Sequence, residues 1–321
     1  MRKILVTGGA GFIGSNFIRY ILNKHNDCYI INLDKLTYAG NRNNLKDIYR
    51  DPRYKFVKGD ICDRFVVDRL AKECDTIINF AAESHVDRSI KKAASFVESN
   101  INGVRVLLDA AKKYKVPRFL QISTDEVYGS IIKGHSKEGD PLRPSSPYAA
   151  TKAAADLLCL SYITTYKIPI IITRSSNNFG EYQFPEKIMP LFITNLHEDK
   201  KVPLYADGMN RRDWIYVLDN CEAIDCVLEK GRTGEIYNIG AGSEKTNLEL
   251  THLILKVMNK PMSFIQHVED RPGHDKRYGL DCKKLKQLGY KPRYDFYKAL
   301  EFTVEWYRDN EWWWRPLKKG R

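Results

Sequence analysis

Short apolar runs alternate with amphipathic stretches along the first 175 residues. The runs are four to six residues long, as expected of strands buried on both faces, and lie at residues 3–7, 28–33, 55–58, 76–80, 118–122 and 169–174. The stretches between them carry apolar side chains at helical spacing, most clearly at residues 17–22, 65–72, 95–114 and 147–166. This alternation predicts an α/β fold with a doubly wound parallel sheet.

The pattern changes after about residue 175. Polar, turn-rich segments follow, and the apolar runs at residues 202–205, 214–217 and 236–239 are short and separated by loops. We therefore expect two units: residues 1–175, which carry the sheet, and residues 176–321, mainly a smaller C-terminal α/β lobe for the substrate. The chain can still cross back between the two units.

The first strand runs directly into a glycine-rich loop. Gly8, Gly11 and Gly14 form the spacing Gly-x-x-Gly-x-x-Gly before a helical pattern, so backbone N–H groups and a helix amino end can meet a pyrophosphate. The second strand ends in Asp34, twenty residues after Gly14, where an acid holds the adenosine ribose hydroxyls and favours NAD over NADP. An ordinary glycine turn is the alternative, but the combined context favours a Rossmann-like NAD-binding domain.

Two further strands end in residues suited to the same ligand. Asp60 and Ile61 follow the third strand and are placed to reach the adenine. Ala81 and Ala82 follow the fourth strand, and their small side chains let a cofactor pass close by. We interpret His85, in the same loop, as a substrate contact, although a lone loop histidine more often has neither a binding nor a catalytic role.

Two pairs of ionisable side chains supply candidate chemistry. Asp125 and Glu126 emerge beyond the strand at residues 118–122, at the edge where open α/β sheets bind ligands, and are candidates for an acid and a base. Tyr148 and Lys152 share one face of an alanine-rich helix, so we expect the ammonium to lower the pKa of the phenol and make Tyr148 a general base. A solvated turn and a chance spacing are the respective alternatives.

Basic residues exceed acidic ones but are dispersed. The formal net charge is +12, which permits an anionic substrate or a nucleic acid. Because acids are mixed with the bases throughout, we expect no nucleic-acid partner and mostly solvated surface charge. Arg212 and Arg271 are candidates for a substrate pyrophosphate, since guanidinium groups match phosphate oxygens bidentately; surface salt bridges are the alternative.

The remaining composition excludes several classes of protein. The seven cysteines show no Cys-x-x-Cys spacing, which argues against a disulfide framework and a structural zinc site, and we expect no metal. No apolar run approaches the roughly eighteen residues of a membrane span, and the chain reaches glycine too early for a signal peptide. We expect a cytoplasmic protein with no membrane association.

The glycine spacing and the Tyr-x-x-x-Lys pair together resemble the extended short-chain dehydrogenase/reductase family over nearly the whole chain. Within it, five strings are similar to those of the dTDP-glucose 4,6-dehydratases: residues 34–40, 81–89, 124–129, 177–180 and 270–275. Relatives that epimerise or decarboxylate nucleotide sugars resemble the same scaffold but lack the Asp-Glu doublet after the threonine. The resemblance therefore implies a dehydratase.

The resemblance also implies a role for each reacting side chain. dTDP-glucose would become dTDP-4-keto-6-deoxyglucose by hydride transfer from C4 to NAD, loss of water across C5–C6 and hydride return to C6. Tyr148, helped by Thr124, would take the C4 hydroxyl proton, and Lys152 would tune Tyr148 and hold the nicotinamide ribose. Glu126 would remove the C5 proton, and Asp125, kept protonated by burial and by repulsion from Glu126, would protonate the departing C6 hydroxyl.

Two sets of contacts carry over by position. The implied NAD contacts are Gly8, Gly11, Phe12, Ile13, Gly14, Asp34, Lys35, Thr37, Asp60, Ile61, Ala81, Ala82, Ser99, Tyr148 and Lys152. The substrate contacts are Ser84, Thr124, Asn177, Lys187, Arg212, Asn247, Arg271 and His274, to which we add His85. A homodimer through the helices at residues 95–114 and 147–166, and a pathway supplying deoxysugar or rhamnose for cell-surface polysaccharide, are implied as well.

Several points stay open at this stage. A nucleotide-sugar 4-epimerase, a dehydratase of another nucleotide sugar and a non-catalytic NAD-binding regulator are the alternative functions. Residues 130–145 form a shorter loop than is usual in the family, which bears on closure over the sugar or on dimer contacts. We expect the three tryptophans at residues 312–314 to pack against the lobe or a partner rather than to bind a ligand.

Overall fold

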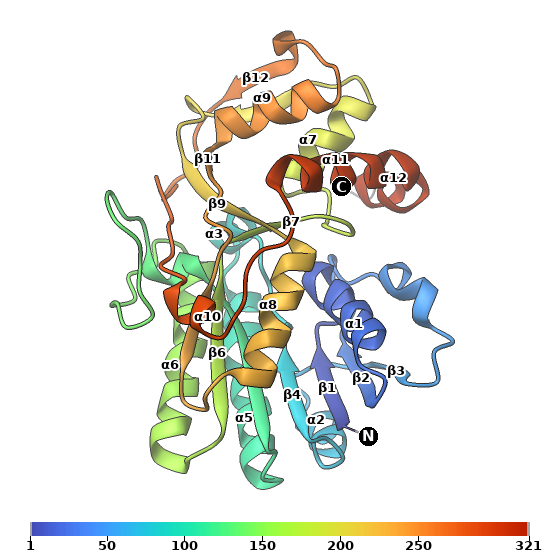
Figure 1. Cartoon of the computed structure of the whole chain (residues 1–321), viewed down its shortest axis with the longest axis vertical. Coiled ribbons are helices and arrows are strands. Elements are labelled where there is room, and N and C mark those ends of the chain that lie inside the picture. Colours follow the sequence, from blue (N-terminus) through green and yellow to red (C-terminus); the bar gives the residue numbers. More distant parts are fainter. Residues whose placement is uncertain (1, 320–321) are drawn as a thin grey trace.

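The computed structural model describes residues 2–319, and within them seven strands form one parallel sheet (Figure 1). Their order across the sheet is β10 (Ile236–Ile239), β6 (Ile170–Ser175), β5 (Arg118–Thr124), β4 (Thr76–Asn79), β1 (Arg2–Thr7), β2 (Cys28–Asp34) and β3 (Tyr54–Lys58). The order reverses between β1 and β4, which places a ligand crevice at the carboxyl ends of these strands. The predicted doubly wound α/β sheet is confirmed.

Helices cover both faces of this sheet (Figure 1). One face carries α1 (Phe12–Lys24) and α8 (Val217–Lys230), and the other carries α2 (Arg64–Ala71), α5 (Val104–Lys113) and α6 (Pro147–Tyr166). Successive side chains of β1 point to opposite faces, so Ile4 and Val6 belong to one apolar core and Leu5 to the other. Burial on both faces explains the continuous apolar runs of the strands.

The long helix expected at residues 95–114 forms, with a π-helical turn inside it. It consists of α4 (Ala94–Val97), the π-helical turn η2 (Glu98–Gly103) and α5, and it follows the short helix α3 (Val86–Lys91). A Cβ atom at Gly103 would lie 2.4 Å from Ile61 Cδ1, so the glycine lets this segment approach Ile61. Such π turns are frequent at functional sites, and Ser99 lies in this one.

The smaller lobe is built from short strands and helices. Its strands are β7 (Asn177–Phe179), β9 (Arg211–Tyr216) and β11 (Glu244–Thr246), which form one sheet, and β8 (Val202–Tyr205), which pairs with β12 (Ile265–Val268). Its helices are α7 (Ile188–His197) and α9 (Asn247–Val257), and the chain continues through α10 (Lys283–Gln287), α11 (Phe296–Asp309) and α12 (Glu311–Lys319). The run at residues 236–239 was expected here, and that expectation was wrong: it is β10, which pairs with β6 in the central sheet.

The C-terminal tryptophans lie on α12. Trp314 is fully buried and Trp313 is 2% exposed, whereas Trp312 is 51% exposed. Figure 1 shows α11 and α12 between the smaller lobe and α1. The tail therefore packs against the chain itself, one of the two outcomes expected.

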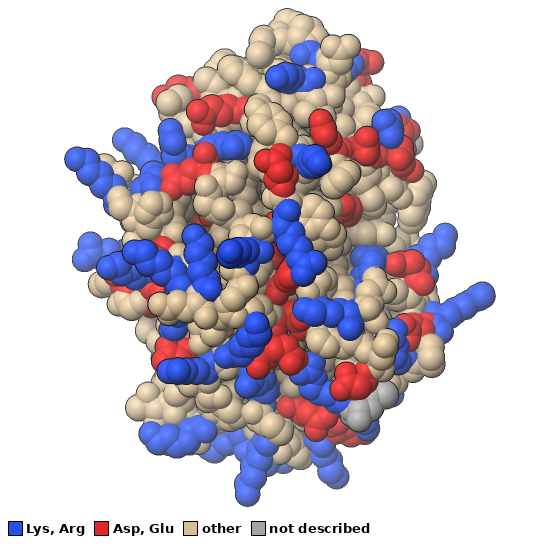
Figure 2. All heavy atoms as spheres, viewed as in Figure 1, with Lys and Arg blue, Asp and Glu red and all other residues tan. Residues whose placement is uncertain are grey.

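Charge on the surface is mixed. Lys and Arg are spread over the face seen in Figure 2, with Asp and Glu interleaved among them. None of the helices among the described residues combines the length and apolar character needed to cross a membrane.

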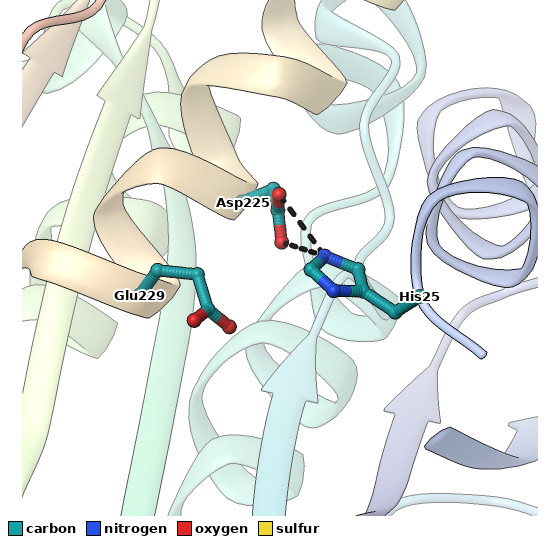
Figure 3. Close-up of side chains that lie close together, drawn as sticks. All are labelled: His25, Asp225 and Glu229. Atoms are coloured by element: carbon teal, nitrogen blue, oxygen red, sulfur yellow. Dashed lines mark hydrogen bonds and ion pairs between the residues drawn. The ribbon is translucent and has the colours of Figure 1, made fainter. Parts of the chain in front are cut away.

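One cluster of ionisable side chains lies at the amino edge of the sheet (Figure 3). His25 Nε2 is 3.0 Å from Asp225 Oδ1, and Glu229 lies close by. Both carboxylates already have cationic partners, since Lys24 lies 2.7 Å from Asp225 and Arg2 lies 2.7 Å from Glu229. The cluster joins the end of α1 to α8.

Candidate active site

Two cavities meet at the carboxyl edge of the sheet. The first cavity, of about 240 Å³, extends from the glycine loop to Tyr148 and Lys152. The second cavity, of about 190 Å³, is lined mainly by residues of the smaller lobe. Gln183, Glu186 and Lys187 line both cavities and mark where they join.

The glycine loop forms one wall of the first cavity. Gly8 has φ +69°, and a Cβ atom there would lie 2.5 Å from the Ala81 nitrogen, so only glycine fits. A Cβ atom at Gly11 would meet only the Gly8 carbonyl oxygen, at 3.2 Å, which leaves the Gly11 backbone facing the cavity. In the described chain no side chain caps the amino end of α1, so its first N–H groups are available to an anion.

Asp34 is fixed beside this loop at the end of β2. One carboxylate oxygen accepts a hydrogen bond from the Ala10 N–H (2.9 Å) and the other from the Leu36 N–H (2.8 Å). Burial raises the pKa of Asp34, and the two backbone bonds oppose that rise. Every residue predicted to contact NAD lines the first cavity. An open helix end, a bare glycine backbone and a buried carboxylate together fit a dinucleotide.

The Asp-Glu doublet lies on a single helical turn directly after β5. Thr124 begins this turn, η3 (Asp125–Tyr128): its hydroxyl accepts a hydrogen bond from the Glu126 N–H (3.3 Å) and donates one to Asp125 Oδ1 (3.2 Å). Gly129 ends the turn with φ +75°, where a Cβ atom would lie 2.1 Å from the Arg143 carbonyl oxygen. The short turn therefore fixes both carboxyl groups relative to the sheet.

The surroundings of the two carboxyl groups differ. Asp125 is 3% exposed, and its Oδ2 has no hydrogen-bond partner within the described residues. Burial and then the charge of Glu126 raise the pKa of Asp125 well above its usual value. Burial also raises the pKa of Glu126, but three nearby cations oppose that rise, those of Lys187, Arg212 and Arg271. This favours a protonated Asp125 beside an ionised Glu126.

Tyr148 and Lys152 lie in the first turns of α6 and line the first cavity. The expected lowering of the phenol pKa by Lys152 is wrong for this structure. Burial, followed by the charges of Glu126 and Asp125, raises the pKa of Tyr148, while a hydrogen bond with Thr124 opposes the rise. The ammonium of Lys152 is itself buried, which lowers its pKa, and it donates a 2.6 Å hydrogen bond to the Ile122 carbonyl.

The second cavity gathers most of the residues predicted for the substrate. They come from loops and strands far apart in the chain and are joined there by Glu126: His85, Asn177, Lys187, Arg212, Asn247, Arg271 and His274. Ser84 instead lines the first cavity, and its carbonyl accepts a 2.8 Å hydrogen bond from Lys187. Thr124 lines neither cavity but forms a hydrogen bond with Tyr148.

The two candidate arginines are held differently. Arg212 is 5% exposed, stacks 4.3 Å above the ring of Tyr278 and donates a 2.8 Å hydrogen bond to the Asp275 carbonyl. It is therefore not a surface ion pair. Arg271 does form a salt bridge, 3.1 Å to Asp87, so the alternative interpretation applies to it in part.

His85 caps the amino end of α3 at the rim of the second cavity. Its Nδ1 accepts a 3.4 Å hydrogen bond from the Arg88 N–H, and its Nε2 lies 3.7 Å from Glu186. Burial and the charge of Lys187 lower the pKa of His85 to about 4. The imidazole is neutral near pH 7, which suits a hydrogen-bonding contact.

Sequence reasoning missed several residues that line the cavities. Asp87 lies within the string at residues 81–89 and Trp214 follows Arg212 closely, so proximity to a motif could have found them. Tyr205 and Tyr278 carried no such signal. The short loop at residues 130–145 packs against the segment after Arg271, through hydrogen bonds such as that from the Ser136 N–H to the Gly279 carbonyl (2.8 Å).

The fold and these cavities define a class. A doubly wound sheet, a glycine loop after its first strand and a Tyr-x-x-x-Lys helix beside the same cavity are the marks of the extended short-chain dehydrogenase/reductases. The chain belongs, within that class, to the family described as GDP-mannose 4,6 dehydratase, whose model matches residues 5–303.

Individual relatives agree with this assignment. A dTDP-glucose 4,6-dehydratase of Streptomyces niveus is 52% identical over 98% of this chain and 96% of its own. The low-salt glycan biosynthesis protein Agl12 of Haloferax volcanii is 53% identical over 95% of this chain and 98% of its own. The crystal structure of a dTDP-glucose 4,6-dehydratase from Streptomyces venezuelae with NAD bound superimposes with a TM-score of 0.96 at 50% identity, covering 98% of this chain and 99% of that one.

Proposed function

We infer that this chain is an NAD-dependent hydro-lyase that converts dTDP-glucose to dTDP-4-keto-6-deoxyglucose. The observation that carries the inference is the turn after β5, where Asp125, with its raised pKa, adjoins Glu126 at the second cavity and Tyr148 at the first. An epimerase needs no such acid and base beyond the tyrosine. The full-length relatives named dTDP-glucose 4,6-dehydratase support the same reaction.

The first cavity would hold the cofactor. The glycine loop and the amino end of α1 would bind its pyrophosphate, Asp34 the adenosine ribose, and Lys152 the nicotinamide ribose. When bound, NAD supplies the hydride acceptor for C4 and returns the hydride to C6, so it is regenerated in each turnover.

Three side chains move the protons. Tyr148 would take the C4 hydroxyl proton; its hydrogen bond with Thr124 favours the phenolate and opposes the rise in pKa that burial causes. Glu126 then removes the C5 proton, which the neighbouring ketone has acidified, and Asp125 protonates the C6 hydroxyl, which leaves as water. C5 regains a proton when the hydride returns to C6, so the substrate loses one water overall.

The second cavity would bind the sugar nucleotide. Arg212 and Arg271 would take the pyrophosphate, because guanidinium groups match phosphate oxygens bidentately. The rest of the sugar nucleotide would be contacted by Asn177, Lys187 and Asn247. Ser84, His85 and His274 would lie beside these residues.

The test is incubation with dTDP-glucose and, in parallel, UDP-glucose, followed by mass spectrometry of the product. Loss of one water with dTDP-glucose alone supports both the reaction and the nucleotide. Loss of water with UDP-glucose indicates a dehydratase of another nucleotide sugar. An unchanged mass with formation of dTDP-galactose indicates a 4-epimerase, and no conversion at all leaves the NAD-binding regulator.

We propose three further properties. Residues 1–175 bind NAD and carry the catalytic groups, and residues 176–321 mainly bind the nucleotide sugar. The chain forms a homodimer through the helical segments at residues 95–114 and 147–166, where Leu157 and Tyr166 are exposed; light scattering that gave the mass of one chain would exclude it. It acts in the cytoplasm in deoxysugar or rhamnose supply for cell-surface polysaccharide, in keeping with the glycan-biosynthesis name of the Haloferax relative.

A further inference from the structure

The C-terminal helix reaches the glycine loop through hydrogen bonds that the reaction does not use. Trp313, on α12, donates its indole N–H to Asn44 Oδ1 at 2.7 Å. Asn44 lies in the 3₁₀ segment η1 (Arg42–Ile48) and is itself buried. Its amide group donates a 2.9 Å hydrogen bond to the Ala10 carbonyl in the glycine loop.

This path continues to the acid that would hold the adenosine ribose. The Ala10 N–H donates to Asp34 Oδ2 at 2.9 Å, so three hydrogen bonds connect α12 to the Asp34 carboxylate. A buried amide that loses one partner leaves the other end of the network strained or unsatisfied. A change at Trp313 should therefore alter the glycine loop, because solvent does not replace the lost hydrogen bond in this buried network.

Aromatic packing holds the indole in place. The Trp313 ring lies 5.7 Å from Tyr182 and 5.2 Å from Trp306. Arg19, which comes from α1, covers Tyr182 at 4.7 Å and donates a 2.6 Å hydrogen bond to the Asn44 carbonyl. The helix that follows the glycine loop and the C-terminal helix thus contact one cluster of packed side chains.

We propose that Trp313 and Asn44 are positioning residues that hold the glycine loop and Asp34 in the geometry the cofactor requires, so that the C-terminal helix governs how long NAD stays bound. Neither side chain lines the first cavity as described, so the effect is indirect. The inference rests on the proposed cofactor site.

The test compares two tryptophans of the same helix. Trp313→Phe keeps a ring but removes the indole donor, and we expect NAD to dissociate about five- to tenfold faster, which corresponds to the loss of one buried hydrogen bond. Trp314→Phe is the matched control: Trp314 is fully buried and its indole donates to the Tyr307 carbonyl (2.7 Å), away from the loop. It should lower the melting temperature similarly and leave NAD release unchanged. Release of prebound radiolabelled NAD is followed by filter binding after dilution into excess unlabelled NAD.

A second variant tests the same path of hydrogen bonds in case Trp313→Phe does not fold. Asn44→Asp keeps the acceptor for Trp313 but loses the donor to Ala10, and should also speed NAD release. The double variant Trp313→Phe/Asn44→Asp should release NAD no faster than the faster single variant, because both break one path. Equal release from Trp313→Phe and Trp314→Phe, or unchanged release from Asn44→Asp, would overturn the positioning role. Failure of the unmutated chain to bind NAD would instead overturn the cofactor site.

Discussion

The two cavities are constructed in opposite ways. The first is built around backbone: the glycine loop and the open end of α1 present N–H groups, and Asp34 is held by two more. The second is built from charged and polar side chains that arrive from distant loops, such as Lys187, Arg212 and Arg271. A backbone site is damaged by adding atoms, whereas a side-chain site is damaged by removing charge. This difference decides which substitutions should break each cavity.

The largest effect is expected where the base or the acid is removed at the reacting carboxyl groups. Glu126→Gln should lower kcat by about 10²- to 10⁴-fold, because the C5 proton then has no base. Asp125→Asn should lower kcat comparably but still let C5 exchange with solvent deuterium, because Glu126 remains. In both variants, mass spectrometry of the recovered substrate measures the exchange at C5, and NADH absorbance measures hydride transfer from C4. Equal loss of exchange in the two variants would contradict these roles.

Adding one methyl group should break the first cavity. Gly11→Ala places a Cβ toward the cavity with only one close contact, so the fold should survive while NAD affinity falls about 100-fold or more. Gly14→Ala is the contrasting variant, since its Cβ would lie 2.5 Å from the Gly8 carbonyl oxygen and should lower the melting temperature as well. Calorimetric titration measures the NAD affinity of each variant, and thermal unfolding measures its melting temperature. A Gly11→Ala protein with normal NAD affinity would exclude this backbone as the pyrophosphate site.

A conservative change at a buried arginine tests the second cavity. Arg212→Lys keeps the charge but loses the planar group stacked on Tyr278, and should raise the KM for the sugar nucleotide about tenfold with little change in kcat. Arg211→Lys, at the neighbouring position of the same strand, is the control and should leave KM unchanged. Equal effects of the two substitutions would place the pyrophosphate elsewhere.

The smallest effect is a gain in stability. Because the native pKa of Asp125 lies well above 3.8, the native state keeps a proton that the unfolded chain releases above about pH 3.8. Stability therefore falls as the pH rises from 3.8 toward the native pKa. Asn cannot ionise, so Asp125→Asn should remove this fall and make the free energy of unfolding at pH 7 larger than that of the unmutated chain. Urea unfolding at several pH values measures it; a less stable variant at pH 7 would mean that the native carboxyl is ionised.

The same contrast explains what the sequence could predict. Most of the first cavity comes from consecutive strands, loops and helices, so Asp34 could be named from the strand pattern and Ser99 from the family resemblance, and all the NAD contacts named in advance line it. Tyr205 and Tyr278 could not be named, because their place depends on how distant loops meet. The partner of β10 also depends on long-range pairing. The raised pKa of Tyr148 was missed because it follows from burial and from carboxyl groups of another element.

The most direct test of the dehydratase assignment uses dTDP-glucose that carries deuterium at C4. The product should have lost one water and kept the deuterium, now at C6, because the hydride taken from C4 returns there. A product that has lost the deuterium to solvent, or a substrate recovered with unchanged mass, would contradict the proposed reaction.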